Sequence, residues 1–294
     1  MIHKPKIWFW ISLGTITISL IVIVGLRPTL GIDFTGGSLL EIAVPAEIEI
    51  TEAAGRARGF FQGEADLTAT VQTTQEGTLL IRTTPLDETQ HQAVVEKLRE
   101  VEVLGEELRF ESIGPTIGNE LRRKSITAGL VAIVAMIGYL TYTFRQTSGL
   151  IAPWKFGVAA TYALVHDIVV VTALFVGLGR LYQVPIDTLF VTAMLAIAGY
   201  SVNDTVVIFN RFRQEWLVMR QAGLVEVIRR ALRLSLTRSI NTSLTTVLVL
   251  LALLIFGGAT IQWFVLALLM GTIVGTYSSL FVAPPLLVVL TKES

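Results

Sequence analysis

The sequence predicts an α-helical membrane protein with six spanning helices and one folded α+β domain between the first helix and the second. Hydrophobic residues make up 52% of the chain and charged residues only 16%, whereas soluble domains typically contain about 25% charged residues. The mean hydropathy is +0.66. The charges are also segregated, since residues 27–124 contain 17 acidic and 10 basic residues and the rest of the chain contains 6 and 13. The net charge of zero is therefore a cancellation between an acidic domain and a basic, apolar remainder.

The first apolar run covers residues 7–26, between the basic residues Lys4 and Lys6 and the pair Arg27-Pro28. A helix of about twenty apolar residues is long enough to cross a bilayer. A cleaved signal peptide has a shorter apolar core and ends in small residues. The run is therefore predicted to be an uncleaved anchor.

Five further apolar stretches lie near residues 126–144, 156–178, 187–209, 240–257 and 262–290. Each is long enough to form a spanning helix. The last is predicted to bend or end at Pro284 and Pro285, because proline lacks the backbone N–H that a helix interior needs. The predicted parts are a cytoplasmic start with the first span (1–26), a folded domain (27–124) and a bundle of five spans (125–294).

Basic residues in the short connections predict the orientation, since they accumulate on the cytoplasmic side. Lys4 and Lys6 precede the first span, and the connection at 211–238 contains seven arginines. Both ends of the chain are therefore predicted to be cytoplasmic, and the domain at 27–124 extracytoplasmic. The basic run 122–124 is an exception, at the end of a long translocated segment.

The segment 211–233 is both basic and amphipathic. This pattern is typical of a cytoplasmic helix that lies near anionic lipid. A docking surface for a cytoplasmic partner would show the same pattern, so both interpretations stay open.

The extracytoplasmic domain is predicted to contain six elements in the order βαββαβ. The expected strands are 38–44, 66–72, 78–84 and 107–113, and the expected helices are 51–61 and 88–101. In the second helix, Val94, Leu98 and Val101 recur at three and four residues, which is the helical period. The order βαββαβ predicts a ferredoxin-like fold.

Few ionisable residues occur inside the predicted spans, where each costs about 2.5–3.5 kcal/mol at a helix centre. They are His166 and Asp167 in the third span, Asp204 in the fourth and Arg238 at the start of the fifth. The fourth and fifth spans are antiparallel neighbours in the chain, so Asp204 and Arg238 are predicted to meet. Burial favours the protonated acid and a nearby cation favours the carboxylate, so a changing distance between the two would make Asp204 a proton relay. A static buried pair, or an Arg238 that reaches lipid phosphate, is the alternative.

Polar residues around this pair are predicted to face protein or water, because lipid cannot satisfy them. On the fifth span they recur as Ser235, Arg238, Asn241 or Thr242, and Thr245. On the fourth span, Tyr200 shares the face of Asp204, and Asn203 and Thr205 flank that residue. His166 and Asp167 point about 100° apart, so only one of them is expected to face a given partner.

Two glycine patterns predict close backbone contacts. Gly271 and Gly275, four residues apart in the last span, permit close packing of helices. The segment Gly31-Ile-Asp33-Phe-Thr-Gly36-Gly37 predicts a tight turn before the first strand, because glycine tolerates positive φ. Asp33 is expected to be exposed enough to need no partner.

The sequence offers no sign of a metal, a cofactor or a catalytic centre. It contains no cysteine, and His3, His91 and His166 lie too far apart for the spacing of a zinc site. No Walker A loop is present, so ATP hydrolysis is not expected.

At four motifs the sequence resembles the SecF subunits of the SecD/SecF family, which belongs to the RND superfamily. The motifs are residues 31–37, residues 199–211 (Gly-Tyr-Ser-Val-Asn-Asp-Thr-Val-Val-Ile-Phe-Asn-Arg), His166-Asp167, and Arg238-Ser-Ile-Asn-Thr-Ser. The resemblance covers the whole chain and implies half of an RND-like membrane domain. It implies that the family's essential acid and arginine correspond to Asp204 and Arg238, with Asp167 as a further relay residue.

The resemblance also implies a function and partners. The expected function is to use the proton motive force, together with a separate SecD chain, to assist preprotein translocation through the Sec channel. Candidate partners are SecD, the SecYEG translocon, YajC, the preprotein and membrane lipid, with no nucleic acid. The expected location is the inner (plasma) membrane, and the chain is not expected to be an enzyme.

Three other classes of protein share part of this pattern. An intramembrane aspartyl protease also has one aspartate on each of two adjacent spans, and Asp167 and Asp204 are placed in this way. The residues before Asp204 are Ser201-Val202-Asn203, however, and not the Gly-x-Gly that precedes the second aspartate in that family. A structural scaffold of the translocon would keep a buried Asp–Arg pair without moving protons. A small-molecule RND exporter has outer domains far larger than residues 27–124.

Overall fold

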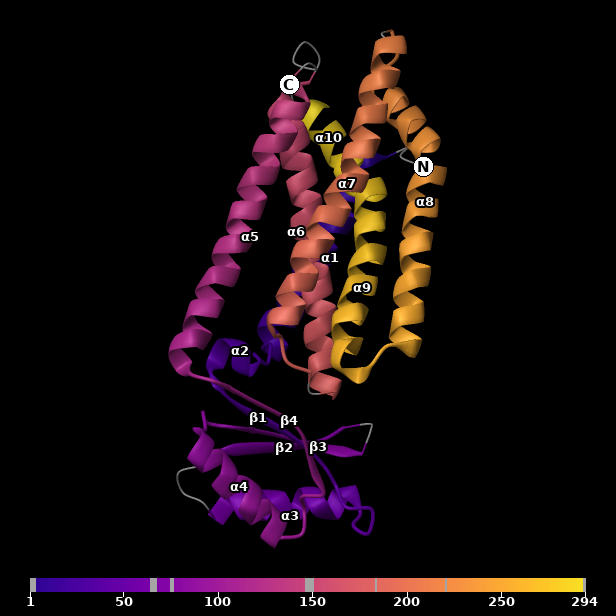
Figure 1. Cartoon of the computed structure of the whole chain (residues 1–294). Helices are drawn as coiled ribbons and strands as arrows, with labels where there is room; N and C mark the ends of the chain where they lie inside the picture. Colours follow the sequence, from indigo (N-terminus) through magenta and orange to yellow (C-terminus); the bar gives the residue numbers. More distant parts are fainter. Residues whose placement is uncertain are drawn as a thin grey trace. The chain divides into compact units, whose positions relative to one another are not determined.

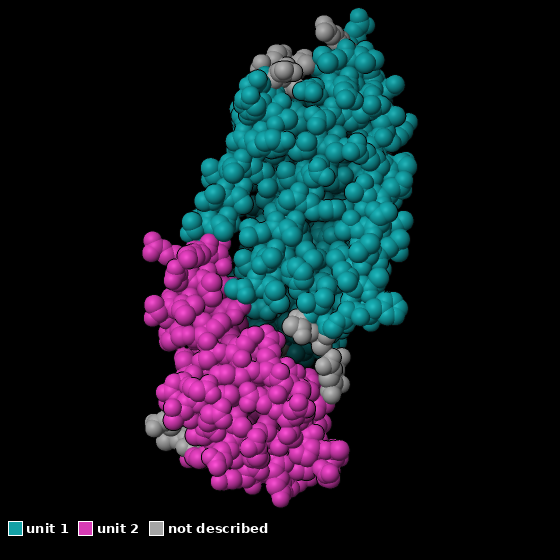
Figure 2. Space-filling view, in the orientation of Figure 1, with its two compact units in different colours: residues 1–29, 127–294 teal, residues 30–126 magenta. Residues whose placement is uncertain are grey.

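The computed structural model describes residues 4–63, 68–74, 77–145, 151–182, 184–219 and 221–292. His3, Arg220 and the first two residues of the strand predicted at 66–72 lie outside these ranges. The chain divides into two compact units, one of residues 30–126 and one of residues 1–29 with 127–294 (Figure 2).

Within the described ranges, six helices are long and apolar enough to cross a membrane, as predicted. They are α1 (Pro5–Leu26), α5 (Pro115–Thr143), α6 (Pro153–Tyr182), α7 (Thr188–Val218), α8 (Leu224–Phe256), and a sixth span made of α9 (Ala259–Phe281) and α10 (Ala283–Lys292) (Figure 1). Together with the domain inserted between α1 and α5, this arrangement confirms the predicted fold class of a multi-pass membrane protein.

Local sequence signals determine where these helices begin and end. Pro5, Pro115 and Pro153 each occupy the first position of a helix, where the missing N–H is not needed. The Asp187 side chain caps α7 by accepting a hydrogen bond of 2.8 Å from the backbone N–H of Phe190. The sixth span is interrupted at Val282, next to the proline pair at 284–285. The last span was predicted to bend or end at the prolines, and the structure shows an interruption of the helix there.

The two glycines of the last span are contact points with α7. A Cβ atom on Gly271 would lie 2.1 Å from Cδ1 of Ile197, and one on Gly275 would lie 3.2 Å from Cβ of Ser201. Both neighbours belong to α7, so the predicted close helix packing is confirmed.

The basic segment at 211–233 does not form a separate helix. Residues 211–218 are the end of α7, and residues 224–233 are the beginning of α8. The buried Glu215 joins the two, because its carboxylate lies 3.3 Å from the Arg211 guanidinium and 2.7 Å from Nε of Arg230. The segment is therefore one end of a long helical hairpin.

The inserted unit is a four-stranded sheet with two helices. Its elements are β1 (Gly37–Ala43), α3 (Ile50–Gly63), β2 (Ala69–Thr73), β3 (Thr78–Thr83), α4 (Glu88–Glu100) and β4 (Glu106–Ile113), preceded by one turn of helix, α2 (Ile32–Thr35). The strand order is β2-β3-β1-β4, and every neighbouring pair is antiparallel. Both α3 and α4 cover the same face of the sheet (Figure 1). This topology confirms the predicted ferredoxin-like order βαββαβ.

The core of this unit follows from the two-residue period of the strands. Leu40 and Ile42 on β1, and Leu79 and Ile81 on β3, are buried. Helices α3 and α4 add buried alanine, phenylalanine, valine and leucine side chains to the same cluster. Asp87 and Gln90 form a capping box at the start of α4.

The turn before β1 partly matches its prediction. Gly36 and Gly37 have φ angles of 73° and 137°, as expected of glycines in a turn. Gly31 instead has φ −70° and precedes α2. Asp33 is half-buried within α2 rather than exposed, because the segment forms a turn of helix and not an open loop.

Candidate functional site

Asp204 on α7 is held by hydroxyl groups from two other spanning helices. Ser239 on α8 donates a hydrogen bond of 2.6 Å to Oδ1 of Asp204. Ser279 on α9 donates a short hydrogen bond to Oδ2. The half-buried carboxyl group therefore joins three helices of the bundle.

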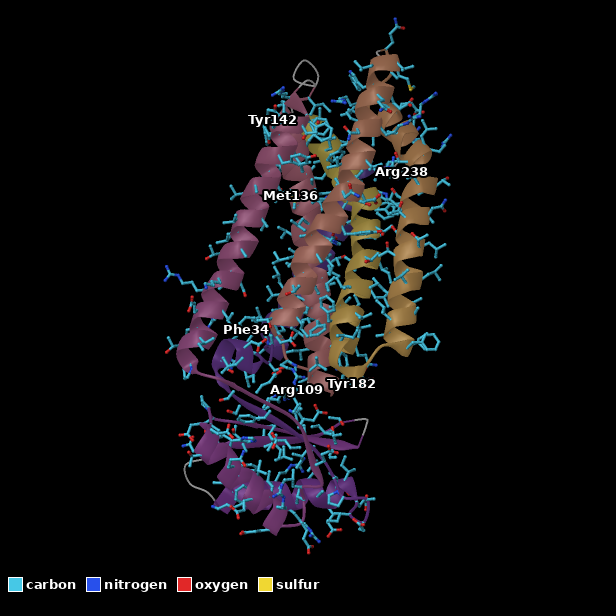
Figure 3. The ribbon with its side chains drawn as sticks, viewed as in Figure 1. Phe34, Arg109, Met136, Tyr142, Tyr182 and Arg238 are labelled. Atoms are coloured by element: carbon cyan, nitrogen blue, oxygen red, sulfur yellow. The ribbon has the colours of Figure 1, made fainter. Side chains whose placement is uncertain are left out.

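The predicted ion pair between Asp204 and Arg238 is not formed. Arg238 is exposed on α8 (Figure 3), and among the residues that the structure describes none makes an ion pair with it. Its neighbour Ser239 occupies the position beside Asp204 instead. Consecutive helical residues point about 100° apart, so α8 turns Ser239 towards the carboxyl group and Arg238 away from it.

Asp167 on α6 forms a second site of the same kind, and it is completely buried. Its Oδ2 accepts hydrogen bonds of 2.6 Å from Ser201 on α7 and 2.7 Å from Ser278 on α9. Its Oδ1 lies 3.1 Å from Nδ1 of His166, the preceding residue. The sequence predicted that only one of the two would face a given partner, and it did not anticipate that His166 would contact Asp167 itself.

The two carboxyl groups are connected through short stretches of two helices. Ser278 and Ser279 are adjacent on α9, and one donates to Asp167 while the other donates to Asp204. On α7, Ser201 lies three residues before Asp204 and donates to Asp167. A displacement of either carboxyl group therefore acts on the same segment of α9.

A further chain of hydroxyl groups extends along α8 and α9. Tyr200 donates to Ser243 at 3.0 Å, and Thr276 donates to the same oxygen at 2.6 Å. The Ser243 hydroxyl donates in turn to the backbone carbonyl of Ser239 at 2.8 Å. Tyr200, which was predicted to share the face of Asp204, thus bonds α8 and not the Asp204 carboxyl group.

The remaining supporting residues divide between the interior and the surface of the unit. Thr205 is buried and bonds the Ser201 carbonyl, whereas Asn203, Asn241 and Thr245 are exposed. The polar stripe of α8 that faces the other helices consists of Ser235, Ser239 and Ser243. Of the predicted stripe of Ser235, Arg238, Asn241 or Thr242, and Thr245, only Ser235 lies on this inward face. A spacing of three or four residues also fits the neighbouring face of the helix.

These carboxyl groups can exist in either protonation state without losing their partners. A serine hydroxyl is one donor and also an acceptor, so it can donate to a carboxylate or accept from a carboxylic acid. No group of three or more histidine, cysteine or acidic side chains that could hold a metal occurs in the described part of the chain. Each of the two carboxyl groups carries one ionisable proton site among hydroxyl partners.

Two family models match the chain. Residues 93–293 match "Protein export membrane protein SecD/SecF, C-terminal", and residues 21–44 match the SecD/SecF GG motif. The second match contains the Gly36-Gly37 turn, and the first contains Asp167, Asp204 and Arg238.

Curated relatives and solved structures give the same assignment. The chain is 38% identical to the protein translocase subunit SecF of Thermobaculum terrenum over 91% of its length and 86% of the relative's. It is 37% identical to SecF of Anaerolinea thermophila over 98% of its length and 93% of the relative's. It superposes on the crystal structure of SecDF from Thermus thermophilus with a TM-score of 0.83 and 29% identity, which covers 99% of this chain and 38% of that one.

These matches have two consequences for the chain's role. The relatives are translocase subunits, so the chain is a transport subunit rather than an enzyme. Its homology to part of a SecDF chain implies association with SecD. The chain belongs to the SecD/SecF family, as one of the SecF subunits that assist Sec protein translocation.

Proposed function

We propose that this subunit couples the proton motive force to preprotein translocation, with Asp204 as the group that binds and releases the proton. The observation that supports this role most strongly is the environment of the Asp204 carboxyl group. It lies among the spanning helices, its partners are hydroxyl groups, and no ion pair with a described residue neutralises it. An uncompensated ionisable group in a membrane domain is expensive and typically functional.

The proposed cycle exchanges the partners of Asp204. In the state described here, Ser239 and Ser279 hold the carboxyl group. A rotation of α8, or a swing of the Arg238 side chain, would bring the guanidinium to the position that Ser239 now occupies. Arginine stays protonated and favours the carboxylate, so pairing with Arg238 would expel the proton. Separation of the pair would let Asp204 take up a proton again.

Proton movement supplies enough energy for such a switch. One charge that crosses 100 mV releases about 2.3 kcal/mol. Since about 1.4 kcal/mol changes an equilibrium constant tenfold, one proton would change the ratio of two conformations by roughly fifty-fold. A second site at Asp167 would increase this bias.

The same proposal includes the orientation and the further partners. The basic residues at the start of α1 and in the α7–α8 hairpin support cytoplasmic termini in an inner (plasma) membrane. The domain formed by β1–β4, α3 and α4 would then face outward, where preprotein emerges. SecYEG and YajC are proposed as neighbours of the complex with SecD.

The test compares two aspartate variants on the same helix in vesicles that contain the chain, SecD and the translocon. Asp204→Asn should abolish the stimulation of export by a proton gradient, because the amide cannot bind the proton. Asp187→Asn is the matched control, because asparagine also caps a helix, and it should retain the stimulation. If Asp204→Asn retains it as well, the chain acts as a structural scaffold and the proposal fails.

A further inference from the structure

Ser278 and Ser279 each lie within hydrogen-bond distance of two alternative acceptors. The Ser278 oxygen lies 2.7 Å from Oδ2 of Asp167 and 3.1 Å from the backbone carbonyl of Gly275. The Ser279 oxygen bonds Oδ2 of Asp204 and lies 3.0 Å from the backbone carbonyl of Thr276. A hydroxyl group has one hydrogen, so the carboxyl group and the backbone carbonyl are competing acceptors for it.

The protonation state of the carboxyl group determines this choice. A carboxylate is an acceptor only, so the serine donates to it. A carboxylic acid has a hydrogen of its own and can donate to the serine oxygen, which releases the serine hydrogen for the backbone carbonyl. Proton binding at Asp167 or Asp204 can therefore redirect a hydroxyl group of α9 onto the backbone three residues earlier.

We infer that Ser278 and Ser279 are positioning residues that convert the charge of Asp167 and Asp204 into a bend of α9. Serine hydroxyls that bond a preceding carbonyl compete with the helical hydrogen bonds there and tend to bend the helix. The affected carbonyls, on Gly275 and Thr276, lie in the part of α9 that packs closely against α7. The inference rests on the proposed function, because it assumes that these carboxyl groups bind protons.

Near the two sites, the surrounding helices carry few ionisable groups, because most of those on α7 and α8 lie towards residues 211–233. On α6, His166 bonds Asp167, and on α9 the ring of Tyr277 lies 6.1 Å from that of His166. Tyr200 on α7 bonds Ser243, and Arg238 on α8 is exposed. The only charged residue of α1 is Lys6, near its start, and the only one of α10 is Lys292, at its last position. The hydroxyl switch therefore responds chiefly to the two aspartates.

The bend can be measured with spin labels, because the chain has no cysteine and accepts labels at chosen positions. Cysteines at Val24 on α1 and Ile261 on α9 would carry them, since both side chains are exposed. The 15 residues between Ile261 and Thr276 are about 22 Å of helix, so a bend of about 10° moves the label by about 4 Å. Distances are measured by double electron–electron resonance at acidic and alkaline pH, on the chain reconstituted with SecD.

In the parent chain, the distance between the labels should change by about 4 Å between acidic and alkaline pH. The variant that combines Ser278→Ala with Ser279→Ala should lose this change. The single variants should each lose part of it, and Ser279→Thr should keep it because threonine retains the hydroxyl group. Thr272→Val is the matched control, since the Thr272 hydroxyl bonds only the Leu268 carbonyl on the same helix. The control should leave the shift unchanged.

Two results would overturn the inference. One is a shift that persists in the variant that combines Ser278→Ala with Ser279→Ala, and the other is the absence of any shift in the parent chain. Neither result depends on the export assay. Asp204→Asn can therefore abolish gradient-stimulated export even if the label distances show no bend of α9 in the parent chain. That combination would keep the proposed function and remove the role of the two serines.

Discussion

Ser279 on α9 donates a hydrogen bond to Asp204 on α7, across 75 positions of the sequence. Together with the bond from Ser239 on α8, it makes one carboxyl group a shared contact of three spanning helices. A change in the charge of that group is therefore transmitted to α8 and α9 at once.

Replacement of Asp167 by alanine should lower the melting temperature of the purified protein. The change removes the acceptor of Ser201 and Ser278 and the partner of His166. Ser278 can still bond the Gly275 carbonyl, so the loss falls on Ser201 and His166. Each buried polar group left without a partner costs about 1–3 kcal/mol. Asp167→Asn retains an acceptor oxygen and should be milder in a thermal unfolding experiment in detergent. Equal melting temperatures for the two variants would contradict this account of the buried site.

Replacement of Gly37 by alanine should destabilise the pairing of β1 with β3. Its φ angle of 137° is one that other residues rarely adopt, and an added Cβ atom would lie 2.8 Å from the Thr83 carbonyl oxygen. Gly55→Ala on α3 is the control, because its Cβ atom would meet nothing within 4 Å and alanine favours a helix by about 1 kcal/mol. Hydrogen exchange of the β1 and β3 amides should become faster in the first variant only.

Replacement of Gly271 by alanine should loosen the contact between α9 and α7. The added Cβ atom would overlap the Ile197 side chain at 2.1 Å, and overpacking of this kind costs about 1–3 kcal/mol. Gly199→Ala on α7, where the Cβ atom meets open space, serves as the control. A melting temperature lowered by both variants to the same extent would show that the Gly271 contact is not special.

Replacement of Glu215 by glutamine should weaken the end of the α7–α8 hairpin. The buried carboxylate pairs with Arg211 and Arg230, and both arginines are partly exposed, so the expected loss is only about 1 kcal/mol. Glu226→Gln removes an exposed carboxylate that pairs with Arg229 within α8 and should have a smaller effect. Hydrogen exchange at residues 211–233 measures the difference. Equal exchange in both variants would indicate that the hairpin is held by apolar contacts alone.

The spans and the inserted domain could be predicted from the sequence because each leaves a periodic or compositional signal. Twenty-residue apolar runs identified α1 and the other spans, and the alternation of strand and helix patterns identified the ferredoxin-like topology. The bend at Val282 followed from the prolines at 284 and 285. These features depend on local composition and on the positions of prolines, both of which can be read from the sequence.

The partners of Asp204 could not be predicted in the same way. Arg238 and Ser239 are consecutive, and a shift of one residue turns a helix face by about 100°. Spacing alone fits the series through Arg238 as well as the series through Ser239 and Ser243. Ser278 and Ser279 lie in a separate span, and a small hydroxyl residue in an apolar helix gives no signal of its partner. Only the packing of α9 against α7 determines that contact.

The separation of Asp204 and Arg238 in different states tests the central claim most directly. Solid-state NMR can measure the distance between the labelled carboxyl carbon and the guanidinium nitrogens in lipid bilayers with SecD, at acidic and alkaline pH. The proposed exchange predicts direct or water-bridged contact in one state and a larger separation, with Ser239 and Ser279 as partners, in the other. A separation beyond water-bridged reach under every condition would contradict the proposed proton switch.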